Sequence, residues 1–200
     1  QGGAATMTLA QAVNAGAGDV RLVSGSNINQ TGGAVTANLL GARAAGAVAL
    51  NSATNNASTV AIATSAAGAI TYQDTNGFTV GTVGTSGNFT SASGVVSNGA
   101  SGDNILLQGG AAVMTLSDNV NAGAGDVRLV SGANINQTAG AVTANLLGAR
   151  AAGAVALNSA TNNASTVAIA TSAAGAITYQ DTNGFTVGTV GTSGNFTSAS

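Results

Sequence analysis

The side chains able to do chemistry are few in this chain. Its charged residues are six Asp and four Arg, and His, Cys, Pro and Trp are absent. Without an imidazole, a thiol or an amine, the chain has no base tuned near neutral pH, no soft metal ligand and no Schiff-base nucleophile. Most classes of enzyme are therefore excluded, and we expect no cofactor.

Two of the carboxylates could form a catalytic pair. The separation of Asp103 and Asp126 along the chain is close to one coil of the solenoid argued for below. Glycosidases use a paired acid and base. The alternative function is therefore that of a polysaccharide-active β-helix enzyme, either a lyase or a glycosidase. Such sites are usually embedded among bases, aromatics and long loops, which this sequence lacks. We therefore expect no catalytic residues.

The segment around Asp103 has one feature of a calcium site, an acidic residue next to glycine. Its sequence, GASGDN, lacks the glycine-aspartate period of calcium-binding solenoids. No metal site is predicted.

A second charged spot combines an acid with a base. Asp19 and Arg21 lie at alternate positions of an expected strand, so they face the same side, and the spot recurs at Asp126 and Arg128. An exposed ion pair contributes only about 0–1 kcal/mol. We interpret both pairs as parts of a solvated outer face.

The remaining bases and the overall charge limit the partners. A net charge of −2 with four Arg provides no basic surface for phosphates, so nucleic acid is not expected as a partner. Arg43 and Arg150 could contact an anionic glycan, but as outward or corner residues they need no partner. The most apolar stretch, residues 34–50, is interrupted by Asn, Gly and Arg, so no membrane span is predicted.

Each half of the chain contains three Asn-x-Ser/Thr sequons. In a sequence this rich in Asn and Thr such triplets arise by chance, with glycosylation as the alternative. The sequons begin at Asn29, Asn56, Asn88, Asn136, Asn163 and Asn195.

An internal repeat organises the whole sequence. Sliding the chain along itself so that Gln1 falls on Gln108 aligns residues 1–93 with residues 108–200, and six of the aligned pairs differ. Residues 1–107 form a complete unit and residues 108–200 a truncated second one, and we expect one continuous structure. The differing pairs are Thr6/Val113, Ala10/Ser117, Gln11/Asp118, Ala12/Asn119, Ser26/Ala133 and Gly32/Ala139.

Within a unit the apolar residues recur at the strand period of two. Val48 and Leu50 form one such pair, and Gly, Asn, Ser or Thr clusters bound each run. The spacings from Val48 to Ile70 and from Val60 to Val80 predict short strands on coils of about 21 residues, hence about five coils per unit. A short helix over residues 39–45 is the local alternative, because the segment is Ala-rich.

This composition suits a right-handed parallel β-helix. A narrow core favours Ala, Val, Ile and Leu, and only six residues are aromatic. Thirty Gly and many Asn suit tight corners, where stacked Asn also form amide ladders. Inner strands pair on both edges and exclude Pro, which has no N–H to donate. At about 4.8 Å per coil, a five-coil unit would be about 24 Å long.

Two phrases carry a resemblance to a known family: GDVRLVSGSNINQTGGAVTANLL (18–40) and GAITYQDTNGFTVGTV (68–83). They are similar to the repeat region of bacterial filamentous-haemagglutinin-like exoproteins and related large adhesins. The resemblance implies right-handed parallel β-helices, export by a two-partner or autotransporter route, and an extracellular or cell-surface location. It also implies work in adhesion or matrix scaffolding, with host or matrix glycans or proteins as partners.

Near-identity of the two units favours a tiled polymer over individually tailored binding sites. The expected partners are therefore further copies of the repeat along a longer chain, with lateral self-association as another possibility. Neither terminal segment, 1–5 or 195–200, resembles a solenoid cap, because both match the interior of the repeat. We expect such ends to stack head to tail.

Overall fold

The computed structural model describes residues 1–199, and all of their regular structure is β. Residue 200, the last residue of the second unit and of its terminal segment, lies outside the described residues. The strands are β1 Met7–Leu9, β2 Val13–Asn14, β3 Val20–Ser24, β4 Ile28–Gln30, β5 Val35–Ala44, β6 Val48–Leu50, β7 Asn56–Thr64, β8 Ile70–Gln73, β9 Thr79–Val80, β10 Thr82–Val83, β11 Ala92–Ser93, β12 Val95–Val96, β13 Ile105–Gly109, β14 Met114–Leu116, β15 Val120–Asn121, β16 Val127–Ser131, β17 Ile135–Gln137, β18 Val142–Ala151, β19 Val155–Leu157, β20 Asn163–Thr171, β21 Ile177–Tyr179 and β22 Thr186–Val187.

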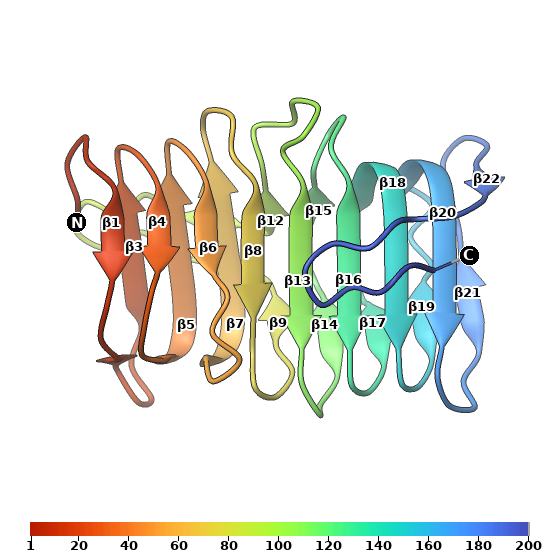
Figure 1. The fold of residues 1–200 in the computed structure, drawn as a ribbon, viewed down its shortest axis with the longest axis horizontal. Helices are drawn as coiled ribbons and strands as arrows, with labels where there is room; N and C mark the ends of the chain where they lie inside the picture. Colours follow the sequence, from red (N-terminus) through yellow and green to blue (C-terminus); the bar gives the residue numbers. More distant parts are fainter. Residues whose placement is uncertain (200) are drawn as a thin grey trace.

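The strands stack as a parallel β-solenoid of about nine coils. One row contains β1, β4, β6, β8, β13 and β16, and the opposite row contains β3, β5, β7, β9, β14 and β17. In Figure 1 the chain advances from left to right, with the near strands β1, β4 and β6 running down and the far strands β3, β5 and β7 running up. This winding is right-handed, the hand expected for parallel crossovers.

The register confirms the predicted spacing. Val48 pairs with Ile70 and Val60 with Val80, as the apolar pattern predicted. Paired strands along a row are about 20 residues apart, except where a row crosses one longer coil, as from Ile70 to Ile105 and from Val80 to Leu116. The unit therefore contains regular coils and one enlarged coil.

The repeat contains a half-integral number of coils. β1 begins the first row, whereas its copy β14 pairs with β9 in the opposite row. The unit 1–107 thus makes about four and a half coils, where the sequence predicted about five. Consecutive units are consequently rotated by half a turn, and equivalent side chains lie on opposite faces of the rod.

Alternate residues of the strands fill a continuous apolar core. In β5 the side chains of Leu40, Ala42 and Ala44 point inward and are at most 5% exposed. Residues 39–44 of the segment for which a helix was the alternative belong to strand β5, because β3 and β7 pair with it on both sides. Inter-strand pairing thus overrides the helical propensity of alanine.

The enlarged coil has one cause: a hairpin inserted into a strand. Val80 pairs with Val60 and Val95 with Ile62, so β9 and β12 together continue one strand. Between them Gly94 donates its N–H to the Gly81 carbonyl at 2.9 Å. We call the excursion 81–94 the first flap and its copy, described over 188–199, the second flap.

Buried amides support the corners. Asn55 is fully buried, and its Oδ1 accepts from Gln30 Nε2 at 2.7 Å and from the Val35 N–H at 2.8 Å. Asn27 Oδ1 accepts the Ala47 N–H of the next coil at 2.9 Å. Asn side chains thus bridge stacked coils mainly through backbone groups and Gln instead of the predicted amide ladders, and Asn76 to Asn56, at 3.4 Å, is an Asn–Asn bond between coils.

The last described coil leaves apolar side chains uncovered. Ile177 is 46% exposed and Val187 is 76% exposed, whereas their copies Ile70 and Val80 are 1% and 0% exposed. The difference arises because another coil covers Ile70 and Val80.

Candidate functional site

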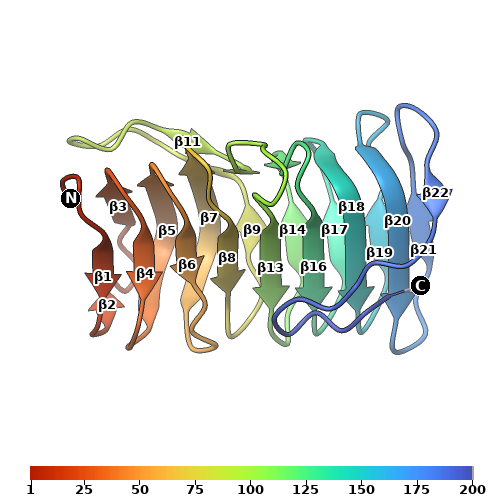
Figure 2. The ribbon, with the colours of Figure 1, turned by 45° about the horizontal axis from the view of Figure 1, so that its top comes forward.

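The most distinctive outer feature of the rod is the flap. The first flap is a hairpin of β10 and β11 that folds back over the outer face of β5 and β7. Figure 2 shows it running along the rod towards the N-terminal end, and Figure 1 shows the second flap lying across β13, β16 and β18 on the opposite face. The half-turn between units places the two flaps on opposite sides.

Each flap covers a small second core outside the solenoid. Beneath the first flap, Val83, Phe89 and Ala92 pack on Ala61, with the partly buried Val23 and Leu39 beside them. Phe89 is 2% exposed, although it belongs to an excursion on the outer face. The flap is therefore held by hydrophobic contact as well as by its own backbone bonds.

A glycine beneath the ring makes this contact possible. A Cβ atom on Gly41 would lie 2.5 Å from Phe89 Cζ, and one on Gly148 would lie 2.4 Å from Phe196 Cζ. Any other residue at these positions would force the aromatic ring away. Gly41 and Gly148 are accordingly docking positions for the flap, in addition to being helix-disfavouring residues.

The charged side chains bind the flap rather than solvent alone. Asp19 forms an ion pair with Arg21 at 3.2 Å, and Arg21 Nε donates to the Gly84 carbonyl of the flap at 3.1 Å. Arg43 Nη1 donates to the Ser91 carbonyl at 3.0 Å. The interpretation of the Asp-Arg pair as a solvated spot, and of Arg43 as needing no partner, is incomplete, because both arginines bond to the flap and Asp19 pairs with one of them.

The second unit repeats these contacts with greater burial. Arg128 Nε donates to the Gly191 carbonyl at 3.0 Å, and Arg150 Nη1 donates to the Ser198 carbonyl at 3.0 Å. Asp126 pairs with Arg128 at 3.3 Å, and the Arg128 guanidinium lies 5.9 Å from the centre of the Phe196 ring. Recurrence in both units makes the flap an integral part of the repeat.

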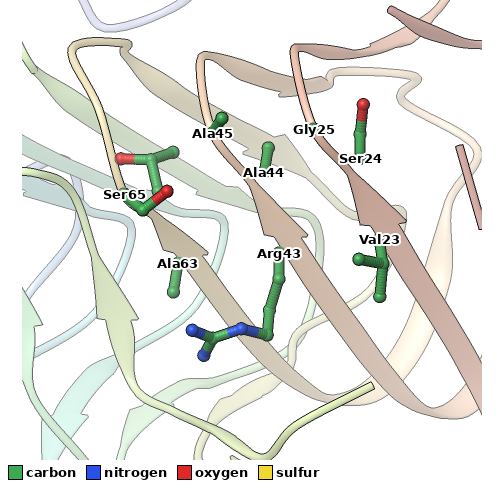
Figure 3. A pocket seen from close by; sticks show the side chains of 9 residues that line it. Val23, Ser24, Gly25, Arg43, Ala44, Ala45, Ala63 and Ser65 are labelled. Carbon is green, nitrogen blue, oxygen red and sulfur yellow. The ribbon is translucent and has the colours of Figure 1, made fainter. Parts of the chain in front are cut away.

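A shallow hollow adjoins this region (Figure 3). It has a volume of about 220 Å³ and is lined by Ser24, Arg43, Ala44, Thr64 and Ser65, among others, and a similar hollow surrounds Arg150. Figure 3 shows the Arg43 guanidinium directed away from Ser24 and Ser65. The Arg43 guanidinium already donates to the Ser91 carbonyl, so an anionic glycan that binds there has to share it with the flap.

The root of the first flap is attached to the next unit. Asp118 Oδ2 accepts hydrogen bonds from the hydroxyls of Thr82, at 2.9 Å, and Ser93. Burial opposes ionisation of Asp118, but the hydrogen bonds from Ser93, Asn119 and Thr82 outweigh it and lower its pKa. Gln11 occupies the equivalent position of the first unit, so this clamp depends on one of the six differences between units.

The Asp118 clamp predicts acid sensitivity at the flap root. Because the folded state lowers the Asp118 pKa below its usual 3.8, the clamp stabilises the root above that value and is lost as the pH falls through the lowered pKa. Amide exchange of Thr82 and Ser93 should accelerate in that acid range. In Asp118→Asn, these amides should exchange faster at neutral pH, and the acceleration at low pH should disappear. If the variant still shows the same acceleration at low pH, Asp118 is not its cause.

Asp103 and Asp126 serve separate structural contacts. Asp103 is 4% exposed, and its carboxylate accepts the N–H of Gly68 at 2.8 Å and of Ala100 at 3.3 Å. Asp126 is committed to Arg128. Within residues 1–199, no group of three or more acidic side chains gathers where it could hold a metal ion.

The sequons differ in accessibility. Asn56, Asn88 and their copies Asn163 and Asn195 are exposed, whereas Asn29 and Asn136 are partly buried. Asn88 lies near the tip of the first flap and donates to Gln1 Oε1 at 2.6 Å. Side-chain exposure thus distinguishes two sequons of each unit from the third.

Sequence reasoning did not find the flap. Its signal is the stretch between Val83 and Val95, where alternation stops and Phe89 is the sole large apolar residue. That pattern also suits an ordinary loop, and the contact of Phe89 with Gly41 joins positions far apart in the chain. Only the folded coils reveal it.

Comparison with known proteins returned no matching family model, curated protein or solved structure. Among the described residues there is no helix with the length and apolar character needed to cross a membrane.

Proposed function

We propose that this chain is a structural repeat segment of a secreted or cell-surface adhesin or fibre that acts in adhesion or in scaffolding of an extracellular matrix. It supplies rigid length, and its partners are further copies of the same unit. The resemblance to filamentous-haemagglutinin-like exoproteins supports the location and the export route.

The observation that carries the proposal is the continuity of stacking across the boundary between units. β13 spans the boundary between the units and pairs with β8 behind it and with β16 of the second unit ahead of it, in unbroken register. Backbone hydrogen bonds therefore join units as they join coils. A chain built in this way lengthens without a hinge, which is the property that a fibre requires.

The half-turn between units affects how such a fibre could bind. Equivalent surfaces alternate between opposite faces, so the same face recurs only every second unit, about nine coils or roughly 43 Å along the rod. Weak sites on each face would act together on a repetitive ligand or on neighbouring rods. This arrangement favours lateral contacts on two sides of the fibre.

The alternative of a polysaccharide-active enzyme has no specific observation in its favour. Asp103 is occupied by backbone N–H groups and Asp126 by Arg128, so neither carboxylate is placed as a free acid or base. We do not propose this activity.

Tandem arrays of two, four and eight complete units should test the fibre proposal. Electron micrographs should show straight rods whose length increases by about 22 Å per unit, from four and a half coils of about 4.8 Å each. Arrays that bend at unit boundaries, or that collapse into globules, would contradict the proposal. Binding of the same arrays to glycan-coated or cell surfaces tests the adhesive part separately.

A further inference from the structure

The two flaps have nearly the same sequence but different surroundings. Beneath the tip of the second flap lies β13, whose residues 105–107 belong to the preceding unit. The outward Leu106 of β13 is 7% exposed and packs in one cluster with Phe196. A Cβ atom on Gly194 would lie 2.7 Å from Leu106 Cδ2. Asn195 Nδ2 also donates to Gln108 Oε1 of its own unit at 3.4 Å, a bond that the first flap makes as well, from Asn88 to Gln1. The second flap thus crosses the boundary between units.

The first flap has no such leucine beneath its tip. A Cβ atom on Gly87, the copy of Gly194, would meet nothing within 4 Å among the described residues. The ion pair below is also more open: the Arg21 and Asp19 side chains are 22% and 27% exposed, against 9% and 18% for Arg128 and Asp126. The second hairpin therefore packs its tip on a leucine of the preceding coil, whereas the first makes no such contact with the described residues.

We propose that the underside of the flap tip, around Gly87 and Phe89, is a docking site for the outward leucine of another unit's final coil. The occupant is a coil with the sequence of residues 94–107, in which the leucine takes the place that Leu106 has under the second flap. The inference rests on the proposed function, because this partner is another unit of the same array.

The flap then acts as a clasp across three consecutive units. Its tip contacts the unit before, as Gly194 contacts Leu106, and its body covers its own unit through Phe89. Its root is bound by Asp118 of the unit after. Stacking by backbone bonds alone would leave unit boundaries no stronger than any other coil boundary. The clasp adds side-chain contacts there, and its root contact requires an Asp such as Asp118 in the following unit, where the first unit has Gln11.

The first arm of the test is Leu106→Ser in the full chain, followed by amide hydrogen exchange. Peptides that run past Ser93 report the first flap, and peptides that end at Ser200 report the second, so the identical hairpins are distinguished. We expect exchange in the tip of the second flap to accelerate about tenfold, to the rate of the first flap. The first flap serves as the control within the molecule and should not change.

The second arm supplies the missing partner. A copy of residues 94–107 is placed directly before Gln1, and the matched control carries the same copy with its penultimate leucine changed to serine. The leucine version should slow exchange of the first flap about tenfold, to the rate of the second flap, and the serine version should not. This arm decides the question if Leu106→Ser fails to fold.

Two outcomes would overturn the clasp. One is a folded Leu106→Ser chain whose second flap exchanges at the original rate. The other is equal protection of the first flap by the leucine and serine versions of the added coil. Neither outcome affects rod length in tandem arrays, which depends on backbone stacking, so failure of the clasp is distinguishable from failure of the fibre proposal.

Discussion

Replacing Asn55 by alanine should destabilise the rod by about 3–5 kcal/mol, since it leaves several buried donors and acceptors without partners at about 1–3 kcal/mol each. Asn55 Oδ1 accepts from Gln30 Nε2 and the Val35 N–H, and Asn55 Nδ2 lies within 3.1 Å of the carbonyls of Leu50 and Gln73. The side chain is fully buried, so water cannot take over these bonds.

The measurement is the free energy of unfolding from urea denaturation. Asn51→Ala is the matched control, because Asn51 lies at the same corner but is exposed, and it should change stability by less than about 0.5 kcal/mol. Equal losses for the two variants would mean that the buried amide network contributes nothing particular to the corner.

Gly41→Val should displace the first flap while leaving the solenoid intact. The new Cβ would fall 2.5 Å from Phe89 Cζ and 3.0 Å from Val83 Cγ1, so the ring has to leave its site. Overpacking of this kind costs roughly 1–3 kcal/mol of stability. Amide hydrogen exchange in the first flap should therefore be faster by about tenfold to a hundredfold. The strand itself tolerates Val, which suits a paired β-position.

Two measurements test this expectation: amide hydrogen exchange in the first flap, and binding of a hydrophobic dye to the apolar surface that the flap uncovers. Gly84→Val is the control within the flap, because a Cβ there meets nothing within 4 Å, and it should leave the flap in place. The second flap should be unaffected in both variants. A Gly41→Val chain whose first flap keeps its protection would show that Phe89 is not its principal anchor.

Much of the solenoid was predictable because it is encoded locally. The pairs Val48–Ile70 and Val60–Val80 were expected from spacing alone, and both are neighbours in the sheet. Inward alternation, a narrow aliphatic core and proline-free strands are properties that each coil needs wherever it lies in the stack. A repeat of short coils therefore shows its architecture in its composition and period.

The count of coils could not be obtained in the same way. Dividing the length of the unit by the expected length of a coil gives about five. A hairpin that leaves the sheet at Gly81 and returns at Gly94, however, adds residues without adding a coil. Whether such a segment is an enlarged corner or an insertion depends on which strands its flanks pair with. The half-turn between units follows from that pairing.

The amino-acid sequence by itself determined that this protein is an all-β, proline-free, weakly charged stack of repeating coils, because strand period, core volume and corner conformation are local requirements. The tertiary structure alone decided the roles of Phe89, Gly41 and the arginines. Each acts across coils, where a ring, a missing Cβ and a carbonyl from distant positions meet. Contacts between positions so far apart in the chain leave no period in the sequence, and only stacking brings them together.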